Sequence, residues 1–275
     1  MLVSIVIPAH NEEACIGDCL RATLREARRS GYDVEVVVVN NASTDRTAAV
    51  ASGFPGVRIV DEPRKGLSMA RDSGYRATRG ELIVNLDADT HMPGGYIRAV
   101  VQAFERDPRM VCLSGPFLFH DLPAPQQIGA MFFFFFQFLP NTLGQHVLRI
   151  GAAVQGGNFI VRRTALDRIG GYDTSIEFYG EDTDIAIRLS KVGRVSFRMR
   201  LYMPTSGRRL RSQGTFRTAY LAFMNIIFEL LYRRPLTRGH RSAEKPVRTT
   251  KDSRGRSPSI TAASSGRACS PTVAD

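Results

Sequence analysis

Residues 80–90 of the chain read GELIVNLDADT, and this stretch decides the fold prediction. The apolar run at residues 82–84 is rich in β-branched side chains, which predicts a buried strand that continues to Leu86. Asp87 and Asp89 follow directly after it. Ligands of open α/β sheets bind beyond the carboxyl ends of the strands. The stretch therefore predicts two carboxylates at a sheet edge where a ligand binds.

The two acids suggest a metal-assisted site. Residues two apart in an extended segment point the same way, so both carboxylates are expected to face one ligand. Like charges this close repel unless a cation lies near them. Mg²⁺ and Mn²⁺ take oxygen ligands, often one or two carboxylates together with substrate phosphates. The alternative is a solvated acidic turn after a strand, which an isolated Asp-x-Asp motif more often represents.

Strands and helices alternate along the first 119 residues. Apolar runs predict strands at residues 2–7, 34–39, 57–60 and 110–119, and amphipathic segments predict helices at residues 12–29, 67–78 and after Pro93. This alternation indicates an α/β fold with a mostly parallel sheet and helices on both faces. Three strands are followed by polar residues, namely His10-Asn11-Glu12, Asn40-Asn41 and Asp87-Ala88-Asp89. They indicate a nucleotide-type site, although the sequence after the first strand is neither G-x-G-x-x-G nor a P-loop.

The second half of the chain carries different signals. Residues 122–145 contain no charged side chain and include a Phe-rich run at 131–139, which fits a buried helix, an interfacial segment or a groove for an apolar acceptor. Residues 155–163 predict a strand with backbone room supplied by Gly156 and Gly157. Residues 178–184 read FYGEDTD before a helical pattern, so Asp182 is either a helix N-cap or a functional acid. Residues 195–202 predict a further strand, and the basic loop at 206–211 can meet phosphate.

Composition separates the globular part from the C-terminal part. The net charge is +11, and +7 of it falls in residues 233–275. Residues 213–234 are largely apolar with arginines at both ends, which fits a membrane-interface helix, a helix packed on the domain or an oligomer contact. Residues 235–275 are rich in Ser, Pro, Gly and Arg, which indicates a disordered basic tail. No nucleic-acid-binding signature accompanies the charge, so nucleic acid is the least expected partner.

The cysteines and the start of the chain bear on the compartment. The four cysteines form no C-x-x-C motif, which favours a reducing environment without a disulfide framework. The sequence opens directly on a predicted strand, so we expect no secretory signal. These features predict a cytoplasmic protein, and peripheral attachment to the inner face of the cell membrane stays an open alternative.

Five motifs occur in a specific order and spacing: PAHNEE at 8–13, NNASTD at 40–45, RKGLSMAR at 64–71, LDAD at 86–89 and GED at 180–182. With these motifs the chain resembles family 2 glycosyltransferases of the GT-A fold over residues 2–203. The resemblance implies an inverting enzyme that moves a sugar from a nucleotide-diphosphate sugar to a glycan, lipid-linked or small-molecule acceptor. It also implies a divalent metal, Mg²⁺ or Mn²⁺. Processive synthases of the family carry Q-x-x-R-W, and the sequence has no Trp, so a non-processive enzyme is expected.

The family's residue roles carry over to the matching positions as implications of the resemblance. Asp182 matches the catalytic base, Glu181 lies beside it near the acceptor, and Asp89 matches the acid that holds the metal. The positions that match nucleotide-binding residues are Pro8, Ala9, Asn11, Glu12, Asn40, Asn41, Lys65, Gly66, Arg71, Asp87 and Ala88. The resemblance implies a GT-A domain at 1–212, in which residues 1–119 bind the nucleotide sugar and residues 120–212 supply acceptor binding and catalysis.

Two departures from the family pattern affect these implications. Asn40 stands where the family usually has an Asp that contacts the base, and residues 203–209, MPTSGRR, lack the His that relatives often use as a further metal ligand. Without this His, the metal would bind more weakly, or the arginines nearby would share in neutralising the diphosphate charge. Three other hypotheses stay open, because a fold does not fix a function. They are a nucleotide-sugar-binding protein without transfer activity, a membrane-surface scaffold, and a nucleotidyltransferase, which the acidic first loop disfavours.

Overall fold

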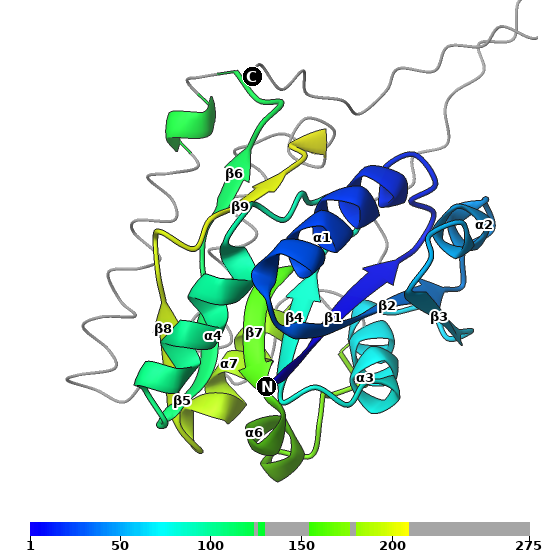
Figure 1. The fold of residues 1–275 in the computed structure, drawn as a ribbon. Helices are drawn as coiled ribbons and strands as arrows, with labels where there is room; N and C mark the ends of the chain where they lie inside the picture. Colours follow the sequence, from blue (N-terminus) through cyan, green and yellow to red (C-terminus); the bar gives the residue numbers. More distant parts are fainter. Residues whose placement is uncertain (124–125, 130–153, 177–179, 209–275) are drawn as a thin grey trace, which may run out of the picture.

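The computed structural model describes residues 1–123, 126–129, 154–176 and 180–208 (Figure 1). Within them, a seven-stranded sheet forms the centre of the molecule, and a second sheet pairs β6 (Phe117–Phe119) with β9 (Met203–Thr205). The strand order of the large sheet is β3 (Val57–Glu62), β2 (Asp33–Asn41), β1 (Leu2–Ala9), β4 (Leu82–Leu86), β7 (Asn158–Arg162), β5 (Met110–Ser114) and β8 (Arg194–Phe197). Only β7 runs antiparallel to its neighbours among these described strands. The prediction of a mostly parallel α/β sheet is confirmed.

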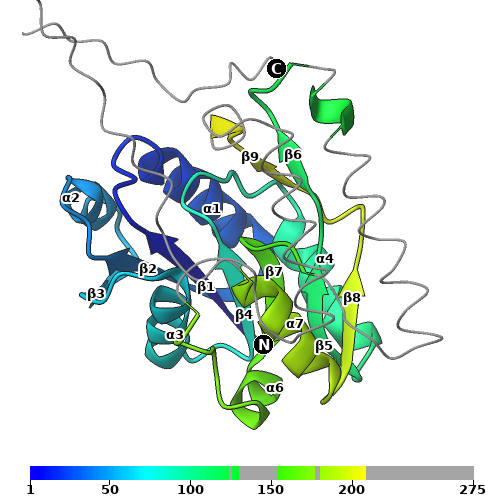
Figure 2. The same ribbon diagram turned by 180° about the vertical axis from the view of Figure 1, so that it is seen from behind.

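Helices cover both faces of the large sheet, as the sequence predicts. Successive residues of a strand point to opposite faces, and in β1 both Ile5 and Val6 are completely buried. Ile5 belongs to the core on the face of α1, α2 and α4, and Val6 to the core on the face of α3, α6 and α7. Figures 1 and 2 show the two faces in turn. The helices are α1 (Ile16–Ser30), α2 (Thr47–Ser52), α3 (Leu67–Ala77), α4 (Tyr96–Arg106), α6 (Arg163–Arg168) and α7 (Glu181–Ser190).

The strand order brings three strand ends together at one rim of the sheet. β1 lies between β2 and β4 and is parallel to both, with Ala9 opposite Asn40 at its end. The carboxyl ends of the three strands therefore meet at the same rim. The turns that leave these ends carry PAHNEE, NNASTD and LDAD, so the fold brings these three motifs together.

Two of the predicted strands are interrupted. Residues 110–119 divide into β5 and β6, because Gly115 packs so closely on the carbonyl of Leu201 that a Cβ there would overlap it, and Pro116 follows without an N–H. Residues 195–202 leave β8 through a turn, in which the Leu201 N–H donates to the Arg198 carbonyl at 3.0 Å. The helices α2 and α6 have six residues each, too few for a periodic apolar pattern to predict them.

Several predictions concern residues outside the described ranges. The Phe-rich run at 131–139, the apolar segment at 213–234 and the basic tail at 235–275 all lie there. In the part of the chain that the structure describes, no helix has the length and apolar character to cross a membrane. The predicted division at residue 119 stays a prediction, and β7 and β8 from its C-terminal side belong to the same sheet as β1 to β5.

Candidate functional site

The loops that follow β1 and β2 are tied together by polar contacts. The N–H groups of Asn11 and Glu12 donate to the side chains of Ser43 and Thr47 at 3.2 and 2.8 Å. In return, Asn11 Oδ1 accepts from the N–H of Thr44 at 2.8 Å. Asn11 has φ of 55°, in the left-handed region where Asn is tolerated better than most residues. These contacts hold the two loops in one arrangement at the rim.

Asn41 fixes the loop after β3. Its side chain is buried, and its Nδ2 donates to the carbonyls of Glu62 and Arg64 at 3.2 and 2.7 Å. Its Oδ1 accepts from the Gly66 N–H at 2.9 Å. Asn41 thereby positions the backbone that carries Lys65, which is exposed. The geometry gives Asn41 and Gly66 a role in shaping the rim.

Asn40 has a different partner. It lies opposite Asp61 in the pairing of β2 with β3, and its Nδ2 donates to Asp61 Oδ1 at 2.8 Å. Its own Oδ1 is buried and has no hydrogen-bond partner among the described residues. The sequence analysis did not single out Asp61. A signal was present, because acidic residues follow the predicted strand at 57–60 just as they follow the one that ends at Leu86. The Asn40–Asp61 pair supplies a carboxylate at a place where the motif alone has an amide.

Arg71 links segments that are far apart in the sequence. Its side chain is 1% exposed, and its Cζ lies 5.1 Å from the centre of the Phe159 ring. Its Nη1 donates to Glu181 Oε1 at 3.0 Å, and its Nη2 lies 3.7 Å from Asp87 Oδ1. A buried charge is tolerated only when it is paired. The buried guanidinium therefore fixes the acid after β4 relative to the acid at the start of α7.

Gly156 and Gly157 bring the backbone before β7 against this cluster. Gly157 has φ of 78°, and a Cβ on it would overlap the carboxylate of Asp87. A Cβ on Gly156 would lie 3.4 Å from Asp182 Oδ2 and 3.6 Å from Arg71 Nη2. Asp182 thus lies beside the same arginine as Asp87. We name these residues, Arg71, Asp87, Glu181 and Asp182, the Arg71 cluster.

Burial raises the pKa of both acids at the start of α7. It raises the pKa of Glu181 to about 8, an effect that the charge of Asp182 increases and that of Arg71 opposes. Burial also raises the pKa of Asp182, against the opposing influence of Arg71 and of the Thr183 N–H. Three carboxyl groups share one arginine, and its charge does not offset the effect of burial on the pKa of Glu181 and Asp182. A carboxylate with a raised pKa is a stronger proton acceptor than one in water.

Asp87 and Asp89 lie on a turn. β4 ends one residue earlier, and Thr90 closes the turn by donating its N–H and its hydroxyl to the Asp87 carbonyl at 3.2 and 2.7 Å. The expectation of an extended segment does not hold, because both acids lie in this turn. Asp87 faces Arg71, whereas Asp89 faces Arg208.

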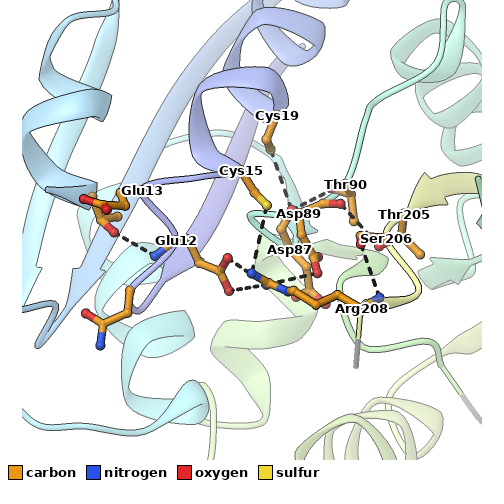
Figure 3. A network of polar contacts seen from close by, with 12 residues as sticks. Glu12, Glu13, Cys15, Cys19, Asp87, Asp89, Thr90, Thr205, Ser206 and Arg208 are labelled. Atoms are coloured by element: carbon orange, nitrogen blue, oxygen red, sulfur yellow. Dashed lines mark hydrogen bonds and ion pairs between the residues drawn. The ribbon is translucent and has the colours of Figure 1, made fainter. Parts of the chain in front are cut away.

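Arg208 joins the acids of two loops at the rim (Figure 3). Its Nη2 donates to the two carboxylate oxygens of Glu12 at 2.9 and 2.8 Å and lies 3.5 Å from Asp89 Oδ2. The backbone nearby is held as well, because the Ser206 N–H donates to the Asp89 carbonyl at 3.3 Å. The Arg208 side chain is 47% exposed. We name Glu12, Asp89 and Arg208 the Arg208 cluster.

The Arg208 cluster decides how well the site fits a divalent metal. Within the described ranges, no three His, Cys, Asp or Glu side chains are grouped so that they could hold a metal ion. Mg²⁺ is often bound by one or two carboxylates together with substrate phosphates. Asp89 and Glu12 have this chemistry, so they fit a metal that is also bound to a diphosphate. The fit requires Arg208 to release Asp89, since both acids contact that guanidinium.

The remaining predicted residues are buried. Pro8 and Ala9 form the buried end of β1, and Ala88 is buried within the acid turn. The sequence indicated that the basic loop at 206–211 can meet phosphate, but it did not indicate which acids Arg208 contacts. No local pattern relates residue 208 to residues 12 and 89, because the contact depends on how β9 is placed.

Comparison with known proteins gives the family. The pattern described as glycosyl transferase family 2 matches residues 4–170, more than half of the chain, and the chain therefore belongs to this family. The probable glycosyltransferase YdaM of Bacillus subtilis is 28% identical over 203 residues, which are 70% of this chain and 47% of that protein. An undecaprenyl-phosphate 4-deoxy-4-formamido-L-arabinose transferase of Pseudomonas paraeruginosa is 36% identical over 107 residues, 37% of this chain and 32% of that protein. The chain spans less than half the length of these relatives.

Solved structures agree on the fold. One is the mannosyltransferase PcManGT from Pyrobaculum calidifontis in complex with GDP-Man and Mn²⁺, which matches with a TM-score of 0.57 at 22% sequence identity. The match covers 83% of this chain and 61% of the mannosyltransferase chain. Another is glucosyl-3-phosphoglycerate synthase from Mycobacterium tuberculosis in complex with Mn²⁺, UDP-glucose and phosphoglyceric acid, which matches with a TM-score of 0.56 at 20% sequence identity. The match covers 84% of this chain and 79% of the synthase chain. At this identity the likeness establishes the GT-A fold that the motifs predicted.

Proposed function

We propose that the protein is an inverting glycosyltransferase that moves one sugar from a nucleotide-diphosphate sugar to an acceptor hydroxyl. The observation that carries the proposal is the Arg71 cluster. One buried guanidinium contacts Asp87 and Glu181, and Asp182 lies beside it. An acid that matches a nucleoside contact is thereby held next to an acid that matches a catalytic base. Membership of glycosyl transferase family 2 supports the same reaction.

The donor nucleotide is proposed to bind at the rim formed by the loops after β1, β2 and β4. Asn11 and Glu12 supply the first loop, and Asn41 with Gly66 shapes the loop beyond it. Asn40 is the residue proposed to read the base. Asp61 accepts from one of the two N–H groups of the Asn40 amide, and the Asn40 Oδ1 is buried, so the second N–H and the exposed Asp61 carboxylate are the groups proposed to meet the base.

Asp182 is the proposed general base. The acceptor oxygen forms a bond to the anomeric carbon while the bond from that carbon to the diphosphate oxygen breaks, and an in-line path inverts the configuration. The acceptor proton passes to the Asp182 carboxylate, and the electron pair of the broken bond leaves with the nucleoside diphosphate. The raised pKa of Asp182 suits it to accept this proton. The Asp182 carboxylate accepts a hydrogen bond from the Thr183 N–H at 2.8 Å, which orients it.

A divalent metal, Mg²⁺ or Mn²⁺, is the proposed cofactor, with Asp89 as its protein ligand and Glu12 as a second carboxylate within the same cluster. Bound there, it would neutralise charge on the leaving diphosphate. The two solved structures described above are complexes that contain Mn²⁺. This supports a divalent metal without choosing between the two ions.

The acceptor is proposed to be a glycan, a lipid-linked molecule or a small molecule. The name of the Pseudomonas relative, an undecaprenyl-phosphate transferase, supports the lipid-linked choice. A cytoplasmic protein that is attached to the inner face of the membrane through residues 213–234 would meet such an acceptor. The membrane attachment is part of the proposal, to be tested by flotation of the chain with liposomes.

The first experiment identifies the donor. Purified protein is screened by thermal shift against nucleotide sugars in the presence of Mg²⁺ and of Mn²⁺, because a ligand of the native state raises the apparent stability. A donor that stabilises the protein is then tested for sugar transfer and for hydrolysis. Binding without turnover on any acceptor would favour the non-catalytic alternative, and the absence of any stabilising nucleotide sugar would contradict the proposal.

The second experiment tests the base. Asp182→Asn is expected to lower kcat by about a hundredfold to ten thousandfold, the usual contribution of general base catalysis, while donor affinity stays within about twofold. Asp184→Asn is the matched control, because Asp184 lies in the same helical turn and pairs with Arg188 at 3.1 Å. Equal losses in both variants would indicate a structural role. Unchanged turnover in Asp182→Asn would exclude Asp182 as the base.

A further inference from the structure

The reaction proposed above leaves Arg208 without a role, yet the structure aims this residue at the donor rim. Its Nη2 makes all of its carboxylate contacts, to Glu12 at 2.9 and 2.8 Å and to Asp89 at 3.5 Å. Figure 3 shows the guanidinium between the two acids, which come from the loops after β1 and β4. A positive charge of the protein itself therefore lies on the acid that is proposed to hold the metal.

The backbone that carries Arg208 is held in place. Ser206 Oγ donates to Asp121 Oδ2 at 2.8 Å and accepts from the Arg208 N–H at 3.2 Å. The His91 N–H donates to the Pro204 carbonyl at 2.8 Å, which ties β9 to the turn after Asp89. Arg208 thus starts from a defined position, and its contact with Asp89 does not depend on a chance orientation of a long loop.

The guanidinium itself retains exposure and unused donors. The Arg208 side chain is 47% exposed, compared with 1% for Arg71. A guanidinium has five N–H donors in a planar fork, and this fork matches phosphate oxygens as well as carboxylates. The two acids engage only Nη2, and Nη1 has a weak contact with Cys15 Sγ at 4.0 Å. Arg208 can therefore turn toward a diphosphate at the rim without leaving a deep pocket.

We propose that Arg208 is a cation of the donor site, which pairs with Asp89 and Glu12 before the donor binds and then binds the donor diphosphate. The inference rests on the proposed function, because it requires a nucleoside diphosphate at this rim. Two consequences follow. Nucleoside diphosphate binding persists when divalent metal is removed, and a metal ion competes with Arg208 for the Asp89 carboxylate.

The competition is tested first, with Mn²⁺ as the only ligand. Electron paramagnetic resonance measures free Mn²⁺ during titration of the full-length protein. Arg208→Ala is expected to bind Mn²⁺ about tenfold more tightly than the wild type, because a charge-assisted contact with Asp89 no longer has to be broken. The gain should disappear in the double variant Arg208→Ala/Asp89→Asn. An affinity within about twofold of the wild type would overturn the competition.

The matched control for this titration is Arg58→Ala. Arg58 is 49% exposed and pairs with Glu35 at 3.1 Å, so it resembles Arg208 in exposure and in pairing. It lies on β3 opposite Val37, away from the strand ends that form the rim. Its removal changes the net charge by the same amount and is expected to leave Mn²⁺ affinity unchanged. An equal gain in Arg58→Ala would show a general charge effect and would overturn the assignment to Arg208.

The diphosphate contact is tested by calorimetry with UDP and with GDP in the presence of EDTA. The wild type is expected to bind one of them, and Arg208→Ala to bind it about tenfold or more weakly, as for the loss of a charge-assisted hydrogen bond. Arg208→Lys, which keeps a point charge without the fork, should fall between them. The Lys variant also serves if the Ala variant fails to fold, which its melting temperature reports.

The outcomes separate this inference from the proposed function. If the wild type binds UDP or GDP only when Mn²⁺ is present, or if Arg208→Ala binds as tightly as the wild type in EDTA, the inference fails and the glycosyltransferase proposal stands. If the wild type binds neither nucleotide with or without Mn²⁺, the proposed function itself fails. The Mn²⁺ titration still reports whether Arg208 holds Asp89 in that case.

Discussion

Two arginines from distant parts of the chain pair with the two acids of one short turn, and their surroundings differ. Arg71 is buried, and its side chain is 1% exposed where it contacts Asp87. Arg208 contacts Asp89 at the rim, with its side chain 47% exposed. Arg208 lies 119 positions from Asp89 in the sequence, and Arg71 also contacts Glu181, which lies 110 positions away. One pair belongs to the interior of the protein, and the other lies in contact with solvent.

The difference teaches what each arginine can do. A buried charge that loses its partner leaves an uncompensated ion in the interior, so the Arg71 cluster acts as one unit and holds the base in place. An exposed pair contributes little to stability, so the Arg208 cluster can exchange one partner for another at small cost. The same Asp-x-Asp motif thus joins two parts of the site. We call the Arg71 cluster the fixed half, and the Arg208 cluster the exchangeable half.

The largest expected effect tests the fixed half. Measured above the Glu181 pKa of about 8, Arg71→Met should lower the free energy of unfolding by about 3 to 5 kcal/mol, because the charged Asp87 and Glu181 lose the cation between them. Arg208→Ala should lower it by about 1 kcal/mol or less. Urea denaturation of the two variants and the wild type measures both values. Similar losses in the two variants would break the comparison.

A double variant separates charge from packing. Adding Glu181→Gln to Arg71→Met removes one of the acids that the arginine neutralised, so part of the lost stability should return. Arg71 also packs on the Phe159 ring with its Cζ 5.1 Å from the ring centre, and this contact is not restored by the second change. Absence of any recovery would assign the whole loss to packing.

The sequence allowed the rim of the site to be predicted but not the pairing within it. Apolar runs that end in His10-Asn11-Glu12, in Asn40-Asn41 and in the Asp-x-Asp turn are local signals, and parallel strands bring such ends to one edge. The pairing of Arg71 with Glu181 joins residues 110 positions apart. It depends on how α7 docks against α3, which no local pattern encodes.

The structural role of single residues was equally hidden. Asn40 and Asn41 are adjacent and identical in type, yet one pairs with Asp61 and the other is buried against the loop after β3. Strand alternation sends neighbouring side chains to opposite sides, so their partners differ. The acid turn after β4 also departs from the predicted extended geometry, because Thr90 closes it on the Asp87 carbonyl.

A smaller effect tests how closely the backbone supports the fixed half. Gly157→Ala should lower the free energy of unfolding by about 1 to 3 kcal/mol more than a strain control does, since the new methyl group would overlap Asp87. Gly170→Ala is the strain control. Gly170 has φ of 79°, close to the 78° of Gly157, and a Cβ on it meets nothing within 4 Å. Equal losses in the two variants would show that Asp87 is free to move aside.

The last prediction concerns pH, and it arises from the burial of the acids in the fixed half. Burial, followed by the charge of Asp182, raises the pKa of Glu181 from 4.5 to about 8, and Arg71 opposes the rise. Between these values the folded protein keeps a proton that the unfolded chain has released, so this group's stabilisation is full below about 4.5 and is lost as pH rises toward about 8.

Glu181→Gln should therefore flatten the fall in stability that the wild type shows as pH rises through this window, measured by urea denaturation in steps of pH.

Glu35→Gln is the control of opposite sign. Burial alone would raise the pKa of Glu35, but hydrogen bonds from the Arg79 N–H and the Ser4 hydroxyl lower it overall. The stabilisation from Glu35 is therefore present at neutral pH and is lost in acid, so its removal should leave the alkaline side of the curve unchanged. The free energy of unfolding of Glu181→Gln could instead fall as steeply as that of the wild type between pH about 4.5 and about 8. Glu181 would then not be the group that causes the fall.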